Sequence, residues 1–179
     1  MVKKVYNRSA LGTLNDLTAT DTSPRYKLGE IVEVIDLDSS TDNSTKNNII
    51  SKYIYIKANV ALTQYQPYQL DYSQTLNAEY ITQTPLTLNL LATIIVPQIA
   101  IALDEYGWAL LKGVGQVLVT AETYEIGDIM ECLNGATALN VDADQYLSPR
   151  SLAIMKEDGT TAVNRAVFLL GKRVSISSS

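Results

Sequence analysis

The amino-acid sequence predicts an all-β protein, a β-sandwich or β-barrel of short antiparallel strands with an extended N-terminal arm. Glycines divide residues 107–135 into short runs rich in Val, Leu, Ile and Thr, the composition of strands joined by tight turns. Apolar and polar side chains alternate along residues 53–63. The dipeptides Asn134-Gly135 and Asp158-Gly159 are typical of β-hairpin turns. About nine short strands separated by such turn signals favour a sandwich or a barrel.

Residues 1–24 are predicted to form the arm. They carry Lys3, Lys4 and Arg8, followed by a stretch rich in Thr, Asp and Ser without helical or strand periodicity. Two interpretations stay open: a frayed terminus, or an arm that becomes ordered on a neighbouring subunit. Residues 25–179 are predicted to form a single β-rich domain, because a chain of 179 residues with 46% hydrophobic residues can bury one core.

Two segments share a pattern that we interpret as a glycine turn leading into a strand. They are residues 26–34, YKLGEIVEV, and residues 124–132, YEIGDIMEC, with an acid after each glycine. Because side chains alternate along a strand, the inward faces are expected to carry Val32 and Val34 in the first copy, and Met130 and Cys132 in the second. The first of these strands, residues 30–35, precedes a polar loop, residues 36–48, with almost no apolar side chain.

The middle of the chain is predicted to continue as strands with one irregular insertion. One face of the strand over residues 53–63 is expected to lie on a core through Ile54, Ile56, Ala58, Val60 and Leu62. Residues 71–92 have a mixed pattern, which predicts an irregular and partly helical insertion. Residues 86–103 have nearly the length of a membrane helix, but Asn89, Pro97 and Gln98 interrupt them, so we predict buried strands.

The last third of the chain is predicted to add further short strands. They are expected at residues 99–103, 108–112, 116–120 and 128–133, with Gly113-Val114-Gly115 as a turn. Asp158-Gly159 is expected to join two strands of a hairpin, residues 151–157 and 160–165. A closing strand over residues 166–176 is expected to place on one face Phe168, Leu170, Val174 and Ile176.

The composition argues against most catalytic and ligand chemistry. The sequence contains no histidine, which removes the usual general base, the Ser-His and Cys-His nucleophile pairs and most zinc sites. Asp36 and Asp38 have the spacing of a calcium loop, but Thr41 stands where that loop requires glycine. The net charge of −5 gives no basic footprint for nucleic acid. We therefore predict no catalytic, cofactor or metal site, and neither nucleic acid nor membrane as a partner.

The aromatic composition points to protein contacts. There are 11 Tyr against one Phe and one Trp, and Tyr combines a large apolar body with a polar tip. As candidate partner contacts we select side chains of the arm and one aromatic pair: Val2, Lys3, Lys4, Tyr6, Arg8, Tyr106 and Trp108. For Trp108 two alternatives stay open: a core position, or a contact residue at an interface or a sugar platform.

Four segments resemble tailed-bacteriophage capsid decoration proteins, also called cement or head auxiliary proteins: YKLGEIVEV, KYIYIKANVALTQYQPY, VPQIAIALDEYGWALLKGVGQVLVTAETYEIGDIMECLNG and GTTAVNRAVFLLGKRVSI. The resemblance covers well over half of the chain. It implies a β-rich structural protein of the virion, made in the host cytoplasm and without enzymatic residues or cofactors. It also implies a homotrimer on the outer capsid surface that stabilises the capsid by bridging neighbouring major capsid subunits. A carbohydrate-binding β-sandwich is the main alternative, and an enzyme using only Asp, Glu, Lys or Tyr is a further one.

Overall fold

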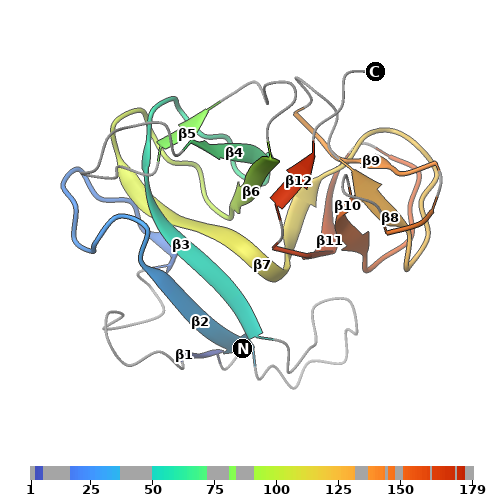
Figure 1. Cartoon of the computed structure of the whole chain (residues 1–179), viewed down its shortest axis with the longest axis horizontal. Helices are drawn as coiled ribbons and strands as arrows, with labels where there is room; N and C mark the ends of the chain where they lie inside the picture. The colour runs from blue at the N-terminus through green and yellow to red at the C-terminus, as the bar shows by residue number, and fades with distance from the viewer. Residues whose placement is uncertain are drawn as a thin grey trace.

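The computed structural model confirms the all-β class. It describes residues 3–5, 17–36, 50–71, 81–83, 91–131, 137–143, 145–147, 151–161, 163–171 and 173–175. Within those ranges there are twelve strands and no α-helix (Figure 1). The strands are β1 (Lys3–Val5), β2 (Ile31–Asp36), β3 (Ile50–Ala58), β4 (Tyr68–Asp71), β5 (Ile81–Gln83), β6 (Leu91–Pro97), β7 (Tyr106–Leu118), β8 (Ile129–Glu131), β9 (Asn140–Val141), β10 (Ser151–Met155), β11 (Asn164–Leu169) and β12 (Arg173–Ser175).

Five of the strands pair in a closed circuit. β3 pairs with β5 in parallel, and the pairs β5–β4, β4–β6, β6–β7 and β7–β3 are antiparallel. Side chains of these strands, together with Leu62 and Ile101 from the connections between them, form one buried cluster: Ile54, Ile56, Ala58, Leu62, Tyr68, Leu70, Ile95, Ile101 and Ala109. β2 and β1 extend the sheet outward from β3, and β12 adds to β6.

The longest strand, β7, belongs to both halves of the structure (Figure 1). Its pairing with β3 ends at Lys112, and its pairing with β11 begins at Gly113. From β11 the second sheet continues through β10 and β8 to β9. Gly113 has a φ of 104°, which bends the strand without reversing it. The prediction of a turn at Gly113-Val114-Gly115 was therefore wrong, because these residues lie inside a continuous strand.

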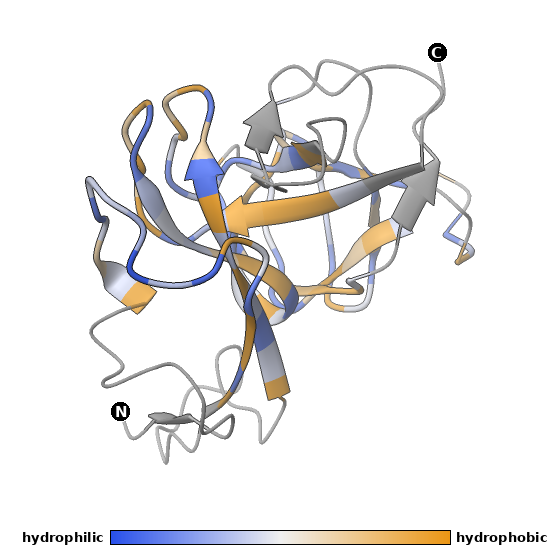
Figure 2. Ribbon diagram, turned by 60° about the vertical axis from the view of Figure 1, so that its left-hand side comes forward, coloured by the Kyte–Doolittle hydropathy of each residue, from blue (hydrophilic) through white to orange (hydrophobic). Residues whose placement is uncertain are grey.

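A second buried cluster fills the space between the two sheets. It includes Val32 and Val34 of β2, Tyr53 and Tyr55 of β3, and side chains of the far sheet such as Met130. β3 thus buries both faces, with Tyr53 and Tyr55 in this cluster and Ile54 and Ile56 in the other, where the alternation predicted one buried face. Figure 2 shows hydrophobic residues along the strands that cross the middle of the molecule.

The two glycine turns are structural equivalents, as their sequences predicted. Gly29 and Gly127 have φ of 78° and 100°. The N–H of Gly29 donates to the carbonyl of Tyr55 (2.8 Å), whose own N–H donates to the carbonyl of Glu30 (2.9 Å). In the second copy, Gly127 donates to Met155 (3.0 Å), and Met155 donates to Asp128 (2.9 Å). The predicted inward residues Val32, Val34 and Met130 are buried, while Cys132 lies outside the described residues.

The predicted hairpin at Asp158-Gly159 exists, but with a longer connection. β10 and β11 pair antiparallel, with Met155 opposite Val167, so the link between them runs from residue 156 to 163. Neither Asp158 nor Gly159 has the positive φ of a type I′ turn, and Gly159 pairs instead with Tyr124. The second hairpin signal, Asn134-Gly135, lies outside the described residues.

Two predicted strands differ in the structure. Residues 99–103 form no strand, since only Ile101 makes a bridge, to Leu62, and Leu103 is 57% exposed. The closing strand is broken near Gly171, which has a φ of 64°, into β11 and β12. Its first part buries Val167 and Leu169, whereas the side chains of Phe168 and Leu170 are only partly buried. Because β11 has apolar residues on both faces, the alternation alone did not identify the buried face, and the prediction that placed Phe168 and Leu170 inward was wrong.

The N-terminal arm does not extend to residue 24. Leu17 is buried in the core, and Asp21 exchanges two backbone hydrogen bonds with Tyr106, each 2.9 Å. β1 pairs with β2 of the same chain, so residues 3–5 lie along the edge of their own sheet. Within the predicted insertion, residues 71–92, the structure has β5, which pairs with β4 and β3. The parts of the insertion that were predicted to be helical lie outside the described residues. The polar loop beyond Asp36 also lies outside them.

Candidate functional site

The predicted contact residues of the arm are only partly described. Lys3 and Lys4 lie in β1, opposite Asp36 and Ile35 of β2. Val2, Tyr6 and Arg8 lie outside the described residues. The structure therefore places the backbone of the basic segment beside β2.

The other two predicted contacts belong to an aromatic cluster formed with Tyr26 and Tyr55. The ring centroids of Tyr55 and Trp108 are 5.1 Å apart, those of Tyr26 and Trp108 are 5.3 Å apart, and Tyr106 stacks on Tyr55 at 6.3 Å. Tyr106 keeps partial exposure, but Trp108 is only 1% exposed. The burial of Trp108 fits the core position that the sequence left open, because the strands and residues 17–30 enclose its indole.

Residues 17–30 are held over this cluster by polar contacts. The hydroxyl of Tyr55 donates to Oδ2 of Asp21 (3.1 Å) and accepts from the N–H of Arg25 (3.2 Å). The guanidinium of Arg25 lies 3.5 Å from Oδ1 of Asp21. In contrast, Nε1 of Trp108 is buried and has no acceptor in the described structure. The sequence identified Tyr106 and Trp108 as candidate contacts. It gave no indication that Asp21 and Arg25 would hold residues 17–30 over these side chains.

Burial of Tyr55 gives the protein a distinct alkaline sensitivity. Removal from water is the main cause that raises the pKa of Tyr55 from 10.0 to about 12, and the nearby Asp21 carboxylate adds to it. The folded state therefore keeps this proton after the unfolded chain has lost it. Stability from this group should be fully present below pH 10 and should fall as the pH rises toward 12. Tyr55→Phe should flatten that decline in urea denaturation measured across this pH window, and an unchanged pH dependence would contradict the assignment.

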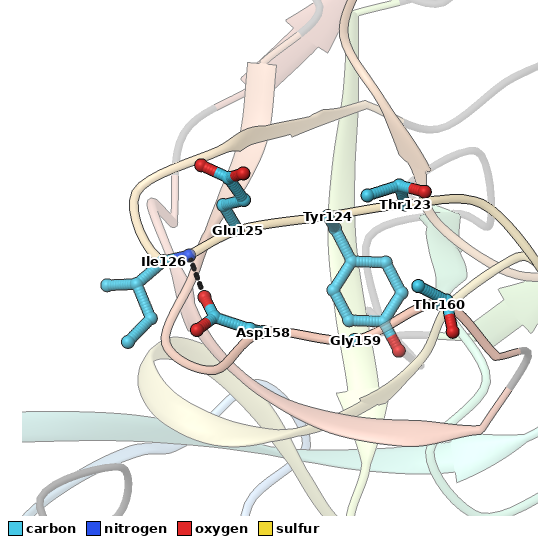
Figure 3. Close-up of a pocket in the computed structure, with 7 residues that line it drawn as sticks. All are labelled: Thr123, Tyr124, Glu125, Ile126, Asp158, Gly159 and Thr160. Atoms are coloured by element: carbon cyan, nitrogen blue, oxygen red, sulfur yellow. Dashed lines mark hydrogen bonds between the residues drawn. The ribbon is translucent and has the colours of Figure 1, made fainter.

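A surface hollow of about 550 Å³ lies at the second glycine turn (Figure 3). The turn and the β10–β11 connection are joined by two backbone hydrogen bonds between Tyr124 and Gly159, of 2.9 and 3.0 Å. The ring of Tyr124 packs against Gly159 so closely that a Cβ there would lie 2.5 Å from the tyrosine oxygen. The lining residues are Thr123, Tyr124, Glu125, Ile126, Asp158, Gly159 and Thr160.

Internal hydrogen bonds hold two of the polar side chains that line this hollow, those of Tyr124 and Asp158. Oδ1 of Asp158 accepts from the N–H of Ile126 (2.7 Å), as Figure 3 shows. The hydroxyl of Tyr124 donates to the carbonyl of Thr161 (3.0 Å) and accepts from Nε of Arg165 (2.7 Å). The sequence marked Tyr124 and Asp158 separately, as a glycine turn and a hairpin signal. Only the fold brings them together.

Several large apolar side chains are exposed at loops between strands. Leu103 is 57% exposed, Ile126 and Leu147 are each 67% exposed, and Tyr146 is 78% exposed. Tyr146 and Leu147 are adjacent in the chain and follow β9. Sequence reasoning did not select them, since single apolar residues in loops carry no pattern.

The structure gives no sign of a metal centre or membrane helix in the part that it describes. No three acidic or cysteine side chains among the described residues are grouped to hold a metal ion. None of the described segments forms a helix with the length and hydrophobicity to cross a bilayer.

No family model and no curated protein matches this chain. Among solved structures, the chain is similar to the head fiber gp8.5 N base of bacteriophage phi29, a protein of a phage head. The identity is 11% and the TM-score is 0.45, and the match covers 68% of this chain and 96% of the other.

Proposed function

We propose that this chain is a structural protein of a phage virion that binds the outside of the capsid and stabilises it by bridging neighbouring major capsid subunits. In this proposal the protein is a homotrimer and catalyses no reaction. The four segments that resemble capsid decoration proteins support the proposal from the sequence.

The structural observation that carries the proposal is the exposed apolar pair Tyr146 and Leu147, at 78% and 67% exposure. Most large apolar side chains of the strands are buried in two cores, and Tyr146 is more exposed than Ile31 and Ile50, which lie in strands at 41% and 42% exposure. Tyr is enriched at protein interfaces, because it adds a large contact area and a polar tip. A partner that covers this pair would remove both side chains from water.

Stabilisation of a capsid does not require tight binding at any single position. Each copy of the protein buries surface across a seam between subunits. Once one protomer of a trimer is bound, the others meet their sites at high effective concentration, so contacts that are weak alone become strong together.

Co-sedimentation with undecorated capsids tests the proposal. The purified protein should pellet with capsids and should raise the temperature at which they disassemble, and light scattering should give the mass of a trimer. Failure to pellet at any protein concentration would overturn capsid binding. A monomer that binds capsids would overturn the trimer alone.

The pair Tyr146 and Leu147 can be tested by a double substitution to serine. We expect capsid affinity to fall about tenfold or more, because truncation of interface anchors typically costs more than 1 kcal/mol each. The free energy of unfolding should change by less than about 0.5 kcal/mol per site, since both side chains are exposed. Thr137→Ala, another exposed position, is the control and should leave both unchanged. Capsid binding that the serine variant retains in full would exclude this pair from the interface.

The alternative of a carbohydrate-binding module loses Trp108 from its platform, which would then consist of tyrosines alone. A sugar stacks on an exposed aromatic face, and Trp108 is enclosed. A glycan array that gave clear binding, abolished by a substitution at exposed Tyr146, would restore this alternative with a different residue.

A further inference from the structure

We propose that the hollow between the second glycine turn and the β10–β11 connection binds a lysine or arginine side chain of the capsid subunit. This inference rests on the proposed function and adds the chemistry of one contact. The hollow is formed by two segments far apart in the chain, around Tyr124 and around Gly159.

The charge of the hollow favours a cationic occupant. Its described lining residues include two carboxyl groups, of Glu125 and Asp158, and no lysine or arginine. The carboxylate of Glu125 makes no ion pair or hydrogen bond with a described residue, and Asp158 uses Oδ1 for the N–H of Ile126. Arg165, the cation beside Tyr124, is already engaged through Nε with the tyrosine hydroxyl and through a second nitrogen with Thr161.

The shape and the apolar surface of the hollow favour a long side chain over a free ion. Ile126 is 67% exposed and lies on the same side of the Tyr124 ring as Asp158 (Figure 3). Lysine and arginine cover apolar surface with their methylene groups while the charged end reaches a polar partner. A carboxylate accepts short, charge-assisted hydrogen bonds from such an end. Ile126 can therefore contact the stem while Glu125 and Asp158 accept hydrogen bonds from its charged end.

The first glycine turn shows that the carboxylates are not required by the turn itself. It has the same backbone hydrogen bonds, yet Lys27 stands at the position that Glu125 occupies in the second copy. The second turn faces a loop that carries a further acid, Asp158. The acidic character is thus specific to this hollow.

The test uses a peptide with a single charged side chain, acetyl-Gly-Arg-Gly-amide, and its neutral citrulline analogue. Amide resonances of Ile126 and Gly159 should shift on titration with the arginine peptide and not with the citrulline peptide. The variant Glu125→Gln/Asp158→Asn keeps the size of both side chains and an acceptor for the N–H of Ile126. It should bind the arginine peptide about tenfold more weakly, because hydrogen bonds to charged groups contribute about 1.5–3 kcal/mol. Glu30→Gln, in the first turn, is the matched control and should bind normally.

Capsids separate a failure of this inference from a failure of the proposed function. The double variant should bind undecorated capsids about tenfold more weakly than the wild type, with a smaller dependence on salt, since it lacks two charges. If the wild type and the double variant bind capsids equally well, the inference is overturned and the proposed function stands. If the wild type binds the arginine peptide but not capsids, the proposed function fails and the hollow remains a site for cationic side chains. Equal shifts with both peptides, or binding of a neutral sugar alone, would overturn the inference.

Discussion

Gly113→Ala should destabilise the protein by about 2–6 kcal/mol, because a conflict of atoms within a packed interior and a strained backbone each cost about 1–3 kcal/mol. A Cβ at this position would lie 2.6 Å from Cα of Ser51 and 2.5 Å from its Oγ, and the backbone atom cannot move aside as a flexible side chain could. The φ of 104° adds strain for any residue with a Cβ. Urea denaturation followed by circular dichroism measures the loss.

Gly127→Ala separates these two causes. Gly127 has a similar φ of 100°, but a Cβ there would meet no atom within 4 Å. We expect a cost of about 1–3 kcal/mol, from backbone strain alone. Equal losses for the two variants would mean that Gly113 of β7 is not tightly packed against Ser51 of β3. The difference between the two losses in the free energy of unfolding measures the cost of the steric conflict with Ser51, at the point where β7 passes from pairing with β3 to pairing with β11.

Trp108→Ala should lower the free energy of unfolding by about 3–5 kcal/mol, the usual cost of truncating a large buried aromatic side chain. The indole contacts Tyr26 and Tyr55 and lies in the cluster shared by both sheets, so its loss leaves a cavity where the two halves of the structure meet. Trp108→Phe should cost less, because it keeps an aromatic ring and removes a buried N–H group that has no acceptor. Thermal and urea denaturation of the wild type, Trp108→Phe and Trp108→Ala should rank their stabilities in that descending order.

This experiment also decides between core and contact roles for Trp108. Tyr146→Ala, at the most exposed of the large apolar side chains, is the comparison and should change stability by less than about 0.5 kcal/mol. If Trp108→Ala instead kept its stability and lost capsid binding, residues 17–30 would have to open and present the indole to a partner.

Local sequence patterns predicted the features that depend on neighbouring residues. The glycine turns at Gly29 and Gly127 were predicted because a positive φ and the strand that follows are encoded within a few residues. Val32, Val34 and Met130 were placed inward for a similar reason, since side chains of a strand alternate. The aromatic pair of the candidate site was found from residue type alone, which gave no information on its burial.

Features that depend on which strands meet were not accessible in this way. The alternation of apolar and polar residues in β3 predicts a strand with one face exposed to solvent. In the structure the second sheet covers that face, so Tyr53 and Tyr55 are buried. Gly113 has the signature of a turn, and whether a glycine reverses a strand or bends it depends on the partners on either side. Tyr124 and Asp158 meet because Tyr124 pairs with Gly159, a contact between segments separated by more than thirty residues.

The sequence by itself determined the all-β class, the two glycine turns and the absence of histidine chemistry, since these follow from residue types and short-range geometry. The tertiary structure alone decided that one long strand joins two sheets, that Trp108 is enclosed, and that acidic and apolar side chains gather at the second turn. The physical reason is that hydrophobic burial is non-directional: it drives apolar faces together, but the pairing of distant strands selects which faces meet and which stay exposed.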